Sequence, residues 1–324
     1  MGESTPARVR TAVIGVGYLG RFHAQKYASI PGSDLVAVVD SDTATAQRVG
    51  AELSTAATTD YRELLGKVDA VSIAVPTPMH FAIASDFLRT GSHVLVEKPI
   101  TATIEEARQL VDLANREQRV LQVGHLERFN PAIVALTGIL RTPRFVESHR
   151  LAPFKERGTD VSVVLDLMIH DIDLIQELVG AAPESIDAVG SSVFSGDIDI
   201  ANARLKFPGG CVANTTASRV SLKQERKIRI FQDDAYISVD LHQKILTIVR
   251  KKVPGPLESP AQVTIDEQSF EQGDALRAEI ESFLGAIRDG TAPVVSGEDG
   301  LRALETATQI AAMVGGTSLA AAKD

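Results

Sequence analysis

Residues 9–20 read VRTAVIGVGYLG, an apolar, β-branched run followed at once by three glycines in the pattern G-x-G-x-x-G. The run from 9 to 14 predicts a buried strand, and the glycines predict a tight turn that opens a helix. In such a turn Gly15 permits the bend, Gly17 lets a ligand approach the backbone, and Gly20 allows the helix to pack closely on the strand. Free N–H groups at the start of the helix attract an anion.

Asp40 ends the next predicted strand, 34–39, at the spacing where a dinucleotide site places the acid that binds the ribose hydroxyls. The alternative is a Gly-rich turn followed by an unrelated surface Asp, but the strand, turn, helix and acid together favour a dinucleotide. A carboxylate here repels the extra phosphate of NADP, and Ser41 and Asp42 bring no arginine to neutralise it. We therefore expect NAD. The predicted cofactor-binding residues lie in the glycine turn, in the first turn of the helix that follows it and at the end of the second strand: Gly15, Gly17, Tyr18, Leu19, Gly20 and Asp40.

Short apolar runs alternate with helical patterns from Arg8 to about Gln122, which is typical of βαβ units around a parallel sheet. A helix is predicted from Tyr61, with Asp60 and Glu63 as a capping box, and another through 105–117. The predicted strands are 9–14, 34–39, 70–75, 93–97 and 119–123. Residues 1–125 are therefore expected to form a doubly wound, Rossmann-type domain.

The pattern changes at Asn130-Pro131, because Asn is a favoured helix N-cap and Pro a favoured first helical residue. Beyond it come a predicted strand (144–151), a strongly apolar helix (162–179), further strand-like runs and two closing helices. The runs are 198–207, 211–220, 226–231, 235–240 and 244–251, and the closing helices are 274–288 and 298–314. The chain is thus expected to be α/β, with a C-terminal α+β domain over 126–324 whose sheet is open and mostly antiparallel.

Composition narrows the class of protein. The formal net charge of −9 disfavours a nucleic-acid partner or an anionic membrane surface. The only cysteine, Cys211, excludes an intrachain disulfide, fits a reducing compartment and is best explained as a small apolar filler. The first ten residues lack the apolar core of a signal peptide, and no stretch reaches the roughly 18 apolar residues of a membrane helix. We expect a cytoplasmic protein.

Residues that directly follow strands are candidates for chemistry, because ligands of doubly wound sheets bind beyond the carboxyl ends of the strands. Thr77 follows the strand 70–75, between two prolines. Glu97 and Lys98 close the strand 93–97, before Pro99. A solvated loop lysine is the alternative for Lys98, but its place beside the cofactor cleft favours a functional role, with Thr77, Glu97 and Lys98 all near the cofactor.

The helix 162–179 is apolar almost all round except for four residues spaced by four, three and four positions. Such spacing places side chains along one helical face, with Asp166 and His170 one turn apart. The stripe could simply face water. Because a helix this apolar is expected to be central, a cleft is the better interpretation. The four residues are Asp166, His170, Asp173 and Glu177.

These motifs together resemble the glucose-fructose oxidoreductase, inositol dehydrogenase and MocA family over nearly the whole chain. They are GVGYLG (15–20), PTPMH (76–80), EKP (97–99) and Asp166-x-x-x-His170. The resemblance implies a Rossmann domain plus an open-sheet α/β domain, and hydride transfer between a sugar or cyclitol carbon and the nicotinamide. It also implies catalytic residues Lys98, Asp166 and His170. Many members carry a glycine-rich stretch before the Asp, where this chain has TDVSV (159–163).

The segments GHLERFNPA (124–132) and APFKERGTD (152–160) are most similar to the branch that acts on UDP-linked amino sugars, especially the UDP-N-acetylglucosamine 3-dehydrogenases. That branch oxidises the 3-hydroxyl to a ketone, which a partner aminotransferase converts to an amine. Arg128 and Arg157 carry the forked donors that suit a diphosphate, although each could instead lie at a surface or a domain interface. Asn130 and Asp173 are further candidates for substrate binding, and Asn130 could serve only as a helix cap.

The resemblance leaves the roles within the reaction centre open. A histidine suits a general base, so we expect His170 to take the hydroxyl proton, Lys98 to hydrogen-bond that oxygen and Asp166 to orient its neighbours. The roles of Lys98 and His170 are interchangeable, since burial can lower the pKa of a lysine. The scattered histidines disfavour a metal.

Other substrates and another class of protein stay open as well. The substrate alternatives are a UDP-aminouronic acid, a free sugar and inositol. The alternative class is a non-catalytic dinucleotide-binding regulator. Because the family often pairs subunits through the exposed face of the second sheet, a homodimer or homotetramer is expected.

Overall fold

The computed structural model describes residues 8–154, 162–252, 255, 259–270 and 273–320. By its contacts the chain divides into two units: residues 1–126 with 274–301 form the first, and residues 127–273 with 302–324 form the second. The sequence-based division places 274–301 with the C-terminal domain, whereas its contacts group it with the first unit. Each unit is described by itself below.

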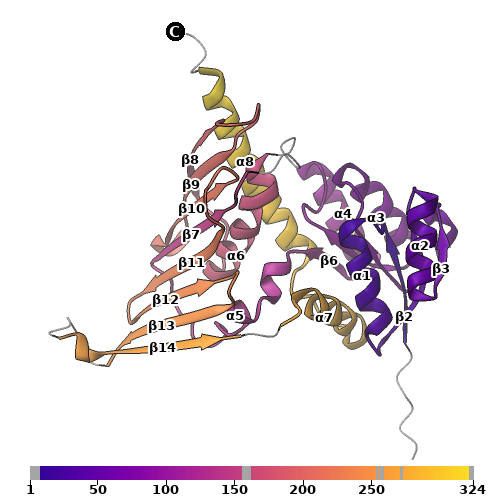
Figure 1. Cartoon of the computed structure of the whole chain (residues 1–324), viewed down its shortest axis with the longest axis horizontal. Coiled ribbons are helices and arrows are strands. Elements are labelled where there is room, and N and C mark those ends of the chain that lie inside the picture. Colours follow the sequence, from indigo (N-terminus) through magenta and orange to yellow (C-terminus); the bar gives the residue numbers. More distant parts are fainter. Residues whose placement is uncertain (1–7, 155–161, 253–254, 256–258, 271–272, 321–324) are drawn as a thin grey trace, which may run out of the picture. The chain divides into compact units, whose positions relative to one another are not determined.

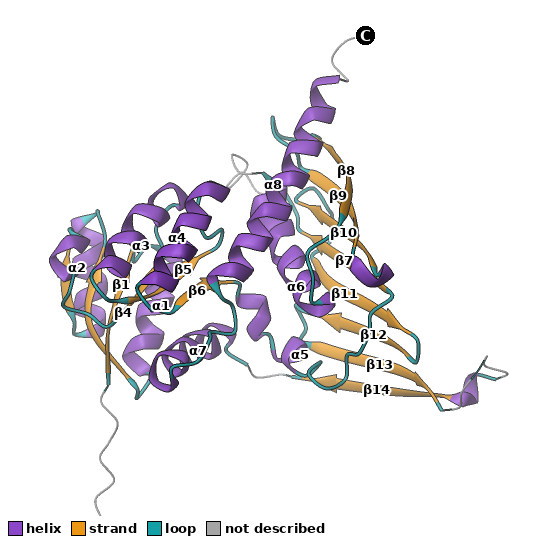
Figure 2. Cartoon of the chain, turned by 180° about the vertical axis from the view of Figure 1, so that it is seen from behind, coloured by secondary structure: helices purple, strands orange, loops and turns teal. Residues whose placement is uncertain are grey.

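The first unit is built on six parallel strands in the order β3-β2-β1-β4-β5-β6, of which Figure 1 labels β2, β3 and β6 and Figure 2 labels β1, β4 and β5. The strands are β1 (Val9–Ile14), β2 (Ser33–Val39), β3 (Ala56–Thr58), β4 (Ala70–Ile73), β5 (His93–Glu97) and β6 (Leu121–Gly124). The order changes direction between β1 and β4, which opens a crevice beyond the carboxyl ends of the strands. The predicted Rossmann topology is confirmed.

Five α-helices and two 3₁₀ turns complete the first unit. They are α1 (Tyr18–Ser29), α2 (Thr43–Leu53), α3 (His80–Arg89), α4 (Ile104–Arg116) and α7 (Ala275–Asp289), with η1 (Tyr61–Leu64) and η2 (Thr77–Met79). The helix predicted from Tyr61 is only the turn η1: Asp60 caps it, but Glu63 accepts a hydrogen bond from Thr58 instead of completing a capping box. The full capping box lies at α4, between Thr103 and Glu106.

Helix α7 belongs to the first unit because its apolar face fills the core of that unit. Ile280, Phe283 and Leu284 are buried in one cluster with Val13 of β1 and Tyr27 of α1. These partners precede α7 by about 250 positions of sequence, with residues 127–273 of the second unit in between, so periodicity predicts the helix but not where it packs.

Two of the three glycines of the turn, Gly15 and Gly20, lie where a side chain would not fit. Gly15 has a φ of +83°, a backbone region that L side chains rarely adopt. A Cβ on Gly20 would lie 1.7 Å from the carbonyl oxygen of Gly15, so α1 rests directly on the backbone of the turn. A Cβ on Gly17 would meet nothing within 4 Å.

The second unit contains an eight-stranded sheet in the order β14-β13-β12-β11-β7-β10-β9-β8 (Figure 2). Only β7 and β10 pair in parallel among the described strands of this sheet, so the predicted mostly antiparallel sheet is confirmed. The strands are β7 (Phe145–Leu151), β8 (Ser185–Ser191), β9 (Ile200–Lys206), β10 (Val212–Ser218), β11 (Glu225–Gln232), β12 (Ala235–Asp240), β13 (Ile245–Lys251) and β14 (Val263–Ser269).

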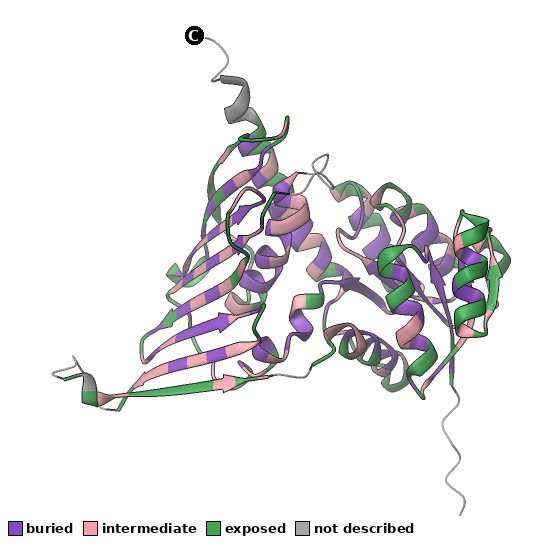
Figure 3. Ribbon diagram, viewed as in Figure 1, coloured by how far each residue is buried: buried purple, intermediate pink, exposed green. Residues whose placement is uncertain are grey.

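Helices pack against this sheet around an apolar core, and buried residues alternate along most of its strands with more exposed ones (Figure 3). The helices are α5 (Pro131–Val134), α6 (Ile169–Val179) and α8 (Gly297–Ala320), which begins in the first unit, and the shorter turns are η3 (Leu126–Phe129), the π-turn η4 (Val164–Met168), η5 (Pro208–Gly210) and η6 (Pro260–Gln262). Within the described ranges, no helix is both long and apolar enough to cross a membrane.

The close approach at Gly20 predicts a large and local effect of one methyl group. Gly20→Ala should lower the free energy of unfolding by about 3 kcal/mol or more, because the new Cβ overlaps a backbone oxygen that cannot move away. Gly17→Ala is the matched control and should cost less than about 1 kcal/mol. Urea unfolding measures both variants. Equal stability of the two would contradict the packing of α1 on the turn.

Candidate functional site

The glycine turn and Asp40 form one hydrogen-bonded group at the carboxyl ends of β1 and β2. Asp40 Oδ2 accepts the backbone N–H of Val16 at 3.0 Å, and Oδ1 accepts that of Asp42 at 3.0 Å. The carboxylate is therefore fixed beside the turn while part of it stays accessible. A carboxylate held in this way suits the paired hydroxyls of a ribose.

A cavity of about 210 Å³ opens at this group. Its lining includes Gly15, Gly17, Asp40, Tyr61, Pro76 and Met79. The first helical residues beyond the turn, Tyr18 and Leu19, are exposed by 72% and 52%. An open Gly17, a helix start and a fixed acid are what a dinucleotide requires, so the residues present fit NAD.

His80 ties together the two loops that follow β4 and β5. Its Nδ1 lies 3.0 Å from the carbonyl oxygen of Pro99, and its Nε2 lies 2.9 Å from that of Val75. Burial lowers the pKa of His80, so the ring is neutral at physiological pH and donates to one carbonyl at a time. The half-buried Thr77 and Lys98 lie on the two loops that His80 joins.

Glu97 at the end of β5 stands at one end of a buried chain of polar side chains. Its Oε1 lies 3.0 Å from His23 Nε2 of α1. His23 Nδ1 lies 3.3 Å from Ser72 Oγ, and this hydroxyl lies 2.9 Å from the hydroxyl of Tyr27. Gly124 leaves room for the carboxylate, because a Cβ there would lie 3.1 Å from Glu97 Oε2.

A second carboxyl group, that of Glu279 on α7, is buried near the first. Only 1% of Glu279 is exposed, and its Oε1 has no hydrogen-bond partner among the described residues. Burial and the charge of Glu97 raise the pKa of Glu279 well above its ordinary value. Burial opposes the ionisation of Glu97 too, but the hydrogen bond and charge of His23 and the charge of Lys98 outweigh it, so the pKa of Glu97 is lowered. Glu97 is the ionised member of the two.

In the second unit, the predicted polar stripe is not a regular helical face. Asp166 lies in the π-turn η4, and His170 lies at the start of α6. A π-turn has a wider repeat than an α-helix and is frequent at functional sites, so the expected four-residue stacking of these two side chains does not apply. Both residues are half-buried.

Arg128 and Asp173 form a buried ion pair rather than an open site. Arg128 Nε and Nη2 donate to the two oxygens of Asp173 at 2.7 and 2.8 Å. Arg128 Nη1 lies 2.8 Å from Glu177 Oε2. The fork that the sequence suggested for a diphosphate is engaged by a carboxylate of α6. Asn130 is likewise engaged: it caps α5 and donates to the carbonyl of Leu241 at 3.0 Å.

A second buried arginine holds the same helix. Arg150 of β7 donates through Nη2 to Asp171 Oδ1 at 2.8 Å and through Nη1 to Glu127 Oε1 at 3.0 Å. Asp171 and Asp173 follow His170 by one and three positions in α6, so two buried arginines fix the segment that carries the histidine. The sequence showed only the residue types. It did not show which charges would be paired and buried.

Arg157 lies outside the described residues. Within the described part of the chain, no group of three or more His, Cys, Asp or Glu side chains could hold a metal ion. The sequence did not single out His23, His80, Arg150 or Glu279. A histidine directly after the PTPM segment was a usable signal for His80, whereas Glu279 sits in an amphipathic helix where a glutamate is normally exposed.

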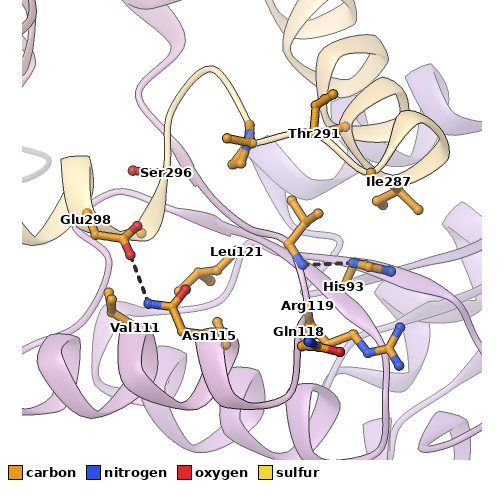
Figure 4. Close-up of a pocket in the computed structure, with 17 residues that line it drawn as sticks. His93, Val111, Asn115, Gln118, Arg119, Leu121, Ile287, Thr291, Ser296 and Glu298 are labelled. Atoms are coloured by element: carbon orange, nitrogen blue, oxygen red, sulfur yellow. Dashed lines mark hydrogen bonds between the residues drawn. The ribbon is translucent and has the colours of Figure 1, made fainter.

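A larger cavity, of about 440 Å³, lies at the end of the first sheet where strands β5 and β6 begin, opposite the carboxyl ends of the strands (Figure 4). It is lined where β5 and β6 begin, by His93 and Leu121, and by residues of the C-terminal part of α4 and the start of α8. Asn115 donates to Glu298 across its rim at 3.0 Å. Burial and the charge of Arg119 lower the pKa of His93 to about 4. This cavity is remote from the carboxyl strand ends and is not part of the nucleotide site.

Two family models match the chain, one in each part. The model described as an oxidoreductase family with an NAD-binding Rossmann fold matches residues 9–125. The model described as a GFO/IDH/MocA C-terminal domain matches residues 133–238.

Individual relatives agree with the family models. The UDP-N-acetylglucosamine 3-dehydrogenase of Acidithiobacillus ferrooxidans is 43% identical over 303 residues, which cover 93% of this chain and 96% of that protein. A solved structure of that bacterium's UDP-N-acetylglucosamine 3-dehydrogenase GnnA has a TM-score of 0.89 at 42% identity, with 95% and 98% of the two chains covered. The inositol 2-dehydrogenase of Rhizobium meliloti is 27% identical over 316 residues, covering 92% of this chain and 94% of that protein.

The buried carboxyl of Glu279 predicts how stability depends on pH. Its folded pKa is raised above its unfolded value, so the folded state keeps a proton that the unfolded state loses. The contribution of Glu279 to the free energy of unfolding should therefore fall as pH rises above about 5, by up to about 1.4 kcal/mol per pH unit. Glu97 adds no slope there, because its pKa is lowered and it is ionised in both states. His80 and His93 add a slope of opposite sign up to about pH 6.5, because their folded pKa values are lowered, so the contribution of Glu279 is the difference between wild type and a variant that lacks the carboxyl.

Glu279→Gln should flatten this fall, because an amide cannot ionise. Urea unfolding at pH values from about 5 to 8 measures it. Glu281→Gln is the matched control on the same helix: Glu281 is about half exposed and pairs with Arg277, so this variant should keep the wild-type slope. Parallel curves for wild type and Glu279→Gln would show that Glu279 is not the protonated group.

Proposed function

The chain belongs to the GFO/IDH/MocA family of NAD-binding oxidoreductases, and we propose that it oxidises the 3-hydroxyl of UDP-N-acetylglucosamine to the 3-keto sugar. One observation carries the choice of substrate: the 43% identity to a UDP-N-acetylglucosamine 3-dehydrogenase extends over 93% of this chain and 96% of that protein. The identity to the inositol 2-dehydrogenase is 27% over a similar length.

The first unit supplies the cofactor site. Gly15, Gly17 and Gly20 shape the turn that receives the pyrophosphate, and Asp40 receives the ribose hydroxyls. Bound NAD supplies the acceptor for the hydride that leaves C3 of the sugar. Thr77 and Glu97 follow neighbouring strands at the same edge, and we assign them to the cofactor site with Tyr18, Leu19 and Lys98.

The proton of the sugar hydroxyl needs a base, and we assign that role to His170. Lys98 hydrogen-bonds the same oxygen and stabilises the negative charge that grows on it, while Asp166 orients these groups. Lys98 comes from the first unit, and Asp166 and His170 come from the second. An exchange of roles between Lys98 and His170 would leave the balance of atoms unchanged: the proton goes to the base and the hydride to NAD.

The substrate-binding assignments divide in two. Arg157 is retained as a candidate for the diphosphate, where a forked guanidinium can contact two oxygens. Inside the second unit, Arg128 and Asp173 pair with each other, and Asn130 donates to the carbonyl oxygen of Leu241. We therefore assign them the task of holding α6 and the loop before α5 in place beside the bound sugar.

A keto sugar is a substrate for transamination, so we also propose that an aminotransferase consumes the product. The single, buried cysteine fits a cytoplasmic location. We propose a homodimer or homotetramer in which the accessible face of the eight-stranded sheet is the contact surface.

The substrate proposal is tested by following NADH formation with NAD and UDP-N-acetylglucosamine, in the presence of an aminotransferase that removes the keto sugar. We expect turnover with this substrate and at least about tenfold lower kcat/KM with a UDP-aminouronic acid, free N-acetylglucosamine or myo-inositol, because a site that binds a diphosphate and an uncharged sugar rejects molecules that lack either. Preferred turnover of inositol would overturn the proposal, and NAD binding without any turnover would indicate a regulator.

The catalytic assignments are tested with His170→Ala and Lys98→Met. Each should lower kcat by about 100- to 10,000-fold, because each removes a group that acts on the reacting oxygen. His242→Ala and Lys67→Met, at exposed positions of the same two units, are the matched controls and should retain activity. Full activity in both His170→Ala and Lys98→Met would remove these residues from the reaction.

A further inference from the structure

We propose that His23 is a positioning residue for Lys98: it holds the Glu97 carboxylate by a hydrogen bond from α1, and Glu97 in turn fixes the orientation of the neighbouring lysine. The inference rests on the proposed function of Lys98, and it adds a residue that touches neither cofactor nor substrate. Its basis is the buried chain of contacts from α1 to the end of β5.

The contacts reach Glu97 from inside the first unit. Of His23, 2% is exposed, so a ligand in the crevice cannot contact it. Its two ring nitrogens lie 3.0 Å from Glu97 Oε1 and 3.3 Å from Ser72 Oγ. An ionised carboxylate only accepts hydrogen bonds, so Nε2 carries a proton, and Ser72, which also bonds Tyr27, can serve Nδ1 as donor or acceptor. His23 can direct an N–H at the carboxylate without competition from water.

The link from Glu97 to Lys98 is short. The two residues are adjacent at the end of β5, and both the backbone N–H and the charge of Lys98 stabilise the ionised form of Glu97. Loss of the contact from His23 would free the carboxylate to rotate, and the backbone of Lys98 that this carboxylate holds would loosen with it.

Glu279 explains how a carboxylate can stay ionised at such a depth. Two negative charges in one buried region would repel each other strongly. Glu279 of α7 holds its proton and leaves the negative charge on Glu97 alone. The described titratable groups that interact with Glu97 are His23 from α1, His80 at the start of α3, Lys98 at the end of β5 and Glu279 from α7, while Tyr27 lies one step away, bonded to Ser72. Burial raises the pKa of Tyr27, so it too stays neutral.

The test uses His23→Leu, which removes the donor, and His23→Gln, which keeps an amide N–H at a similar reach. We expect His23→Leu to lower kcat at least about tenfold, with KM and the dissociation constant of NADH changed less than about threefold, because the lysine is misplaced while the binding surfaces persist. His23→Gln should recover most of the activity. Gln25→Leu, two residues along α1 and bonded to Glu52 instead, is the matched control.

A second readout needs no sugar. The rate of reductive methylation of Lys98 at one fixed pH, followed by mass spectrometry of the peptide, reports how firmly the side chain is held. In His23→Leu and in Glu97→Gln the rate of labelling should change by about threefold or more, because the carboxylate that positions the lysine is released or replaced. Glu279→Gln should not change it, since this variant replaces a neutral group by a neutral group.

The two readouts separate the possible failures. If wild-type protein does not turn over UDP-N-acetylglucosamine but the labelling rate changes in the variants as expected, the proposed function is wrong and the role of His23 stands. If His23→Leu folds and leaves both kcat and the labelling rate unchanged, the role of His23 is wrong. Lower thermal stability with an unchanged labelling rate and no recovery in His23→Gln would show that His23 only supports the core, and would overturn the proposal.

Discussion

The contact between Gly20 and the carbonyl oxygen of Gly15 is the constraint on which the first unit depends. With no side chain between them, α1 lies against the backbone of the turn. Three residues further along, His23 consequently reaches Ser72 and Glu97 on neighbouring strands. One close approach therefore shapes the phosphate-binding turn and also sets the polar contacts behind Lys98.

In the second unit, buried ion pairs rather than a close backbone contact fix the position of a helix. Arg128 and Arg150 each lose their hydration on burial. Bidentate or paired hydrogen bonds to carboxylates of α6 replace the lost contacts with water. Such pairs contribute little net stability, but removal of one partner leaves an uncompensated charge, so the geometry they fix is strongly enforced. They specify the position of α6 rather than add to its stability, and α6 is the helix that carries His170.

Local patterns in the sequence predicted what is local in the structure. The strand, glycine turn and Asp40 follow one another along the chain, so the nucleotide half of the site could be predicted in detail. The edge strands β3, β8 and β14 were missed because they are short or carry exposed polar residues that give no buried run. Pairing of distant charges, as between Arg128 and Asp173, leaves no periodic trace, and the same holds for the packing of α7 in the first unit.

That packing has a consequence for biosynthesis. The strands of the first sheet leave the ribosome early, but the apolar face that covers Val13 and Tyr27 is translated only after residues 127–273 of the second unit. At synthesis rates of roughly 5–20 residues per second, the nascent sheet waits several seconds or more with that surface uncovered. The first unit to emerge thus stays incomplete until α7 follows, and over that interval it presents an apolar surface that chaperones recognise.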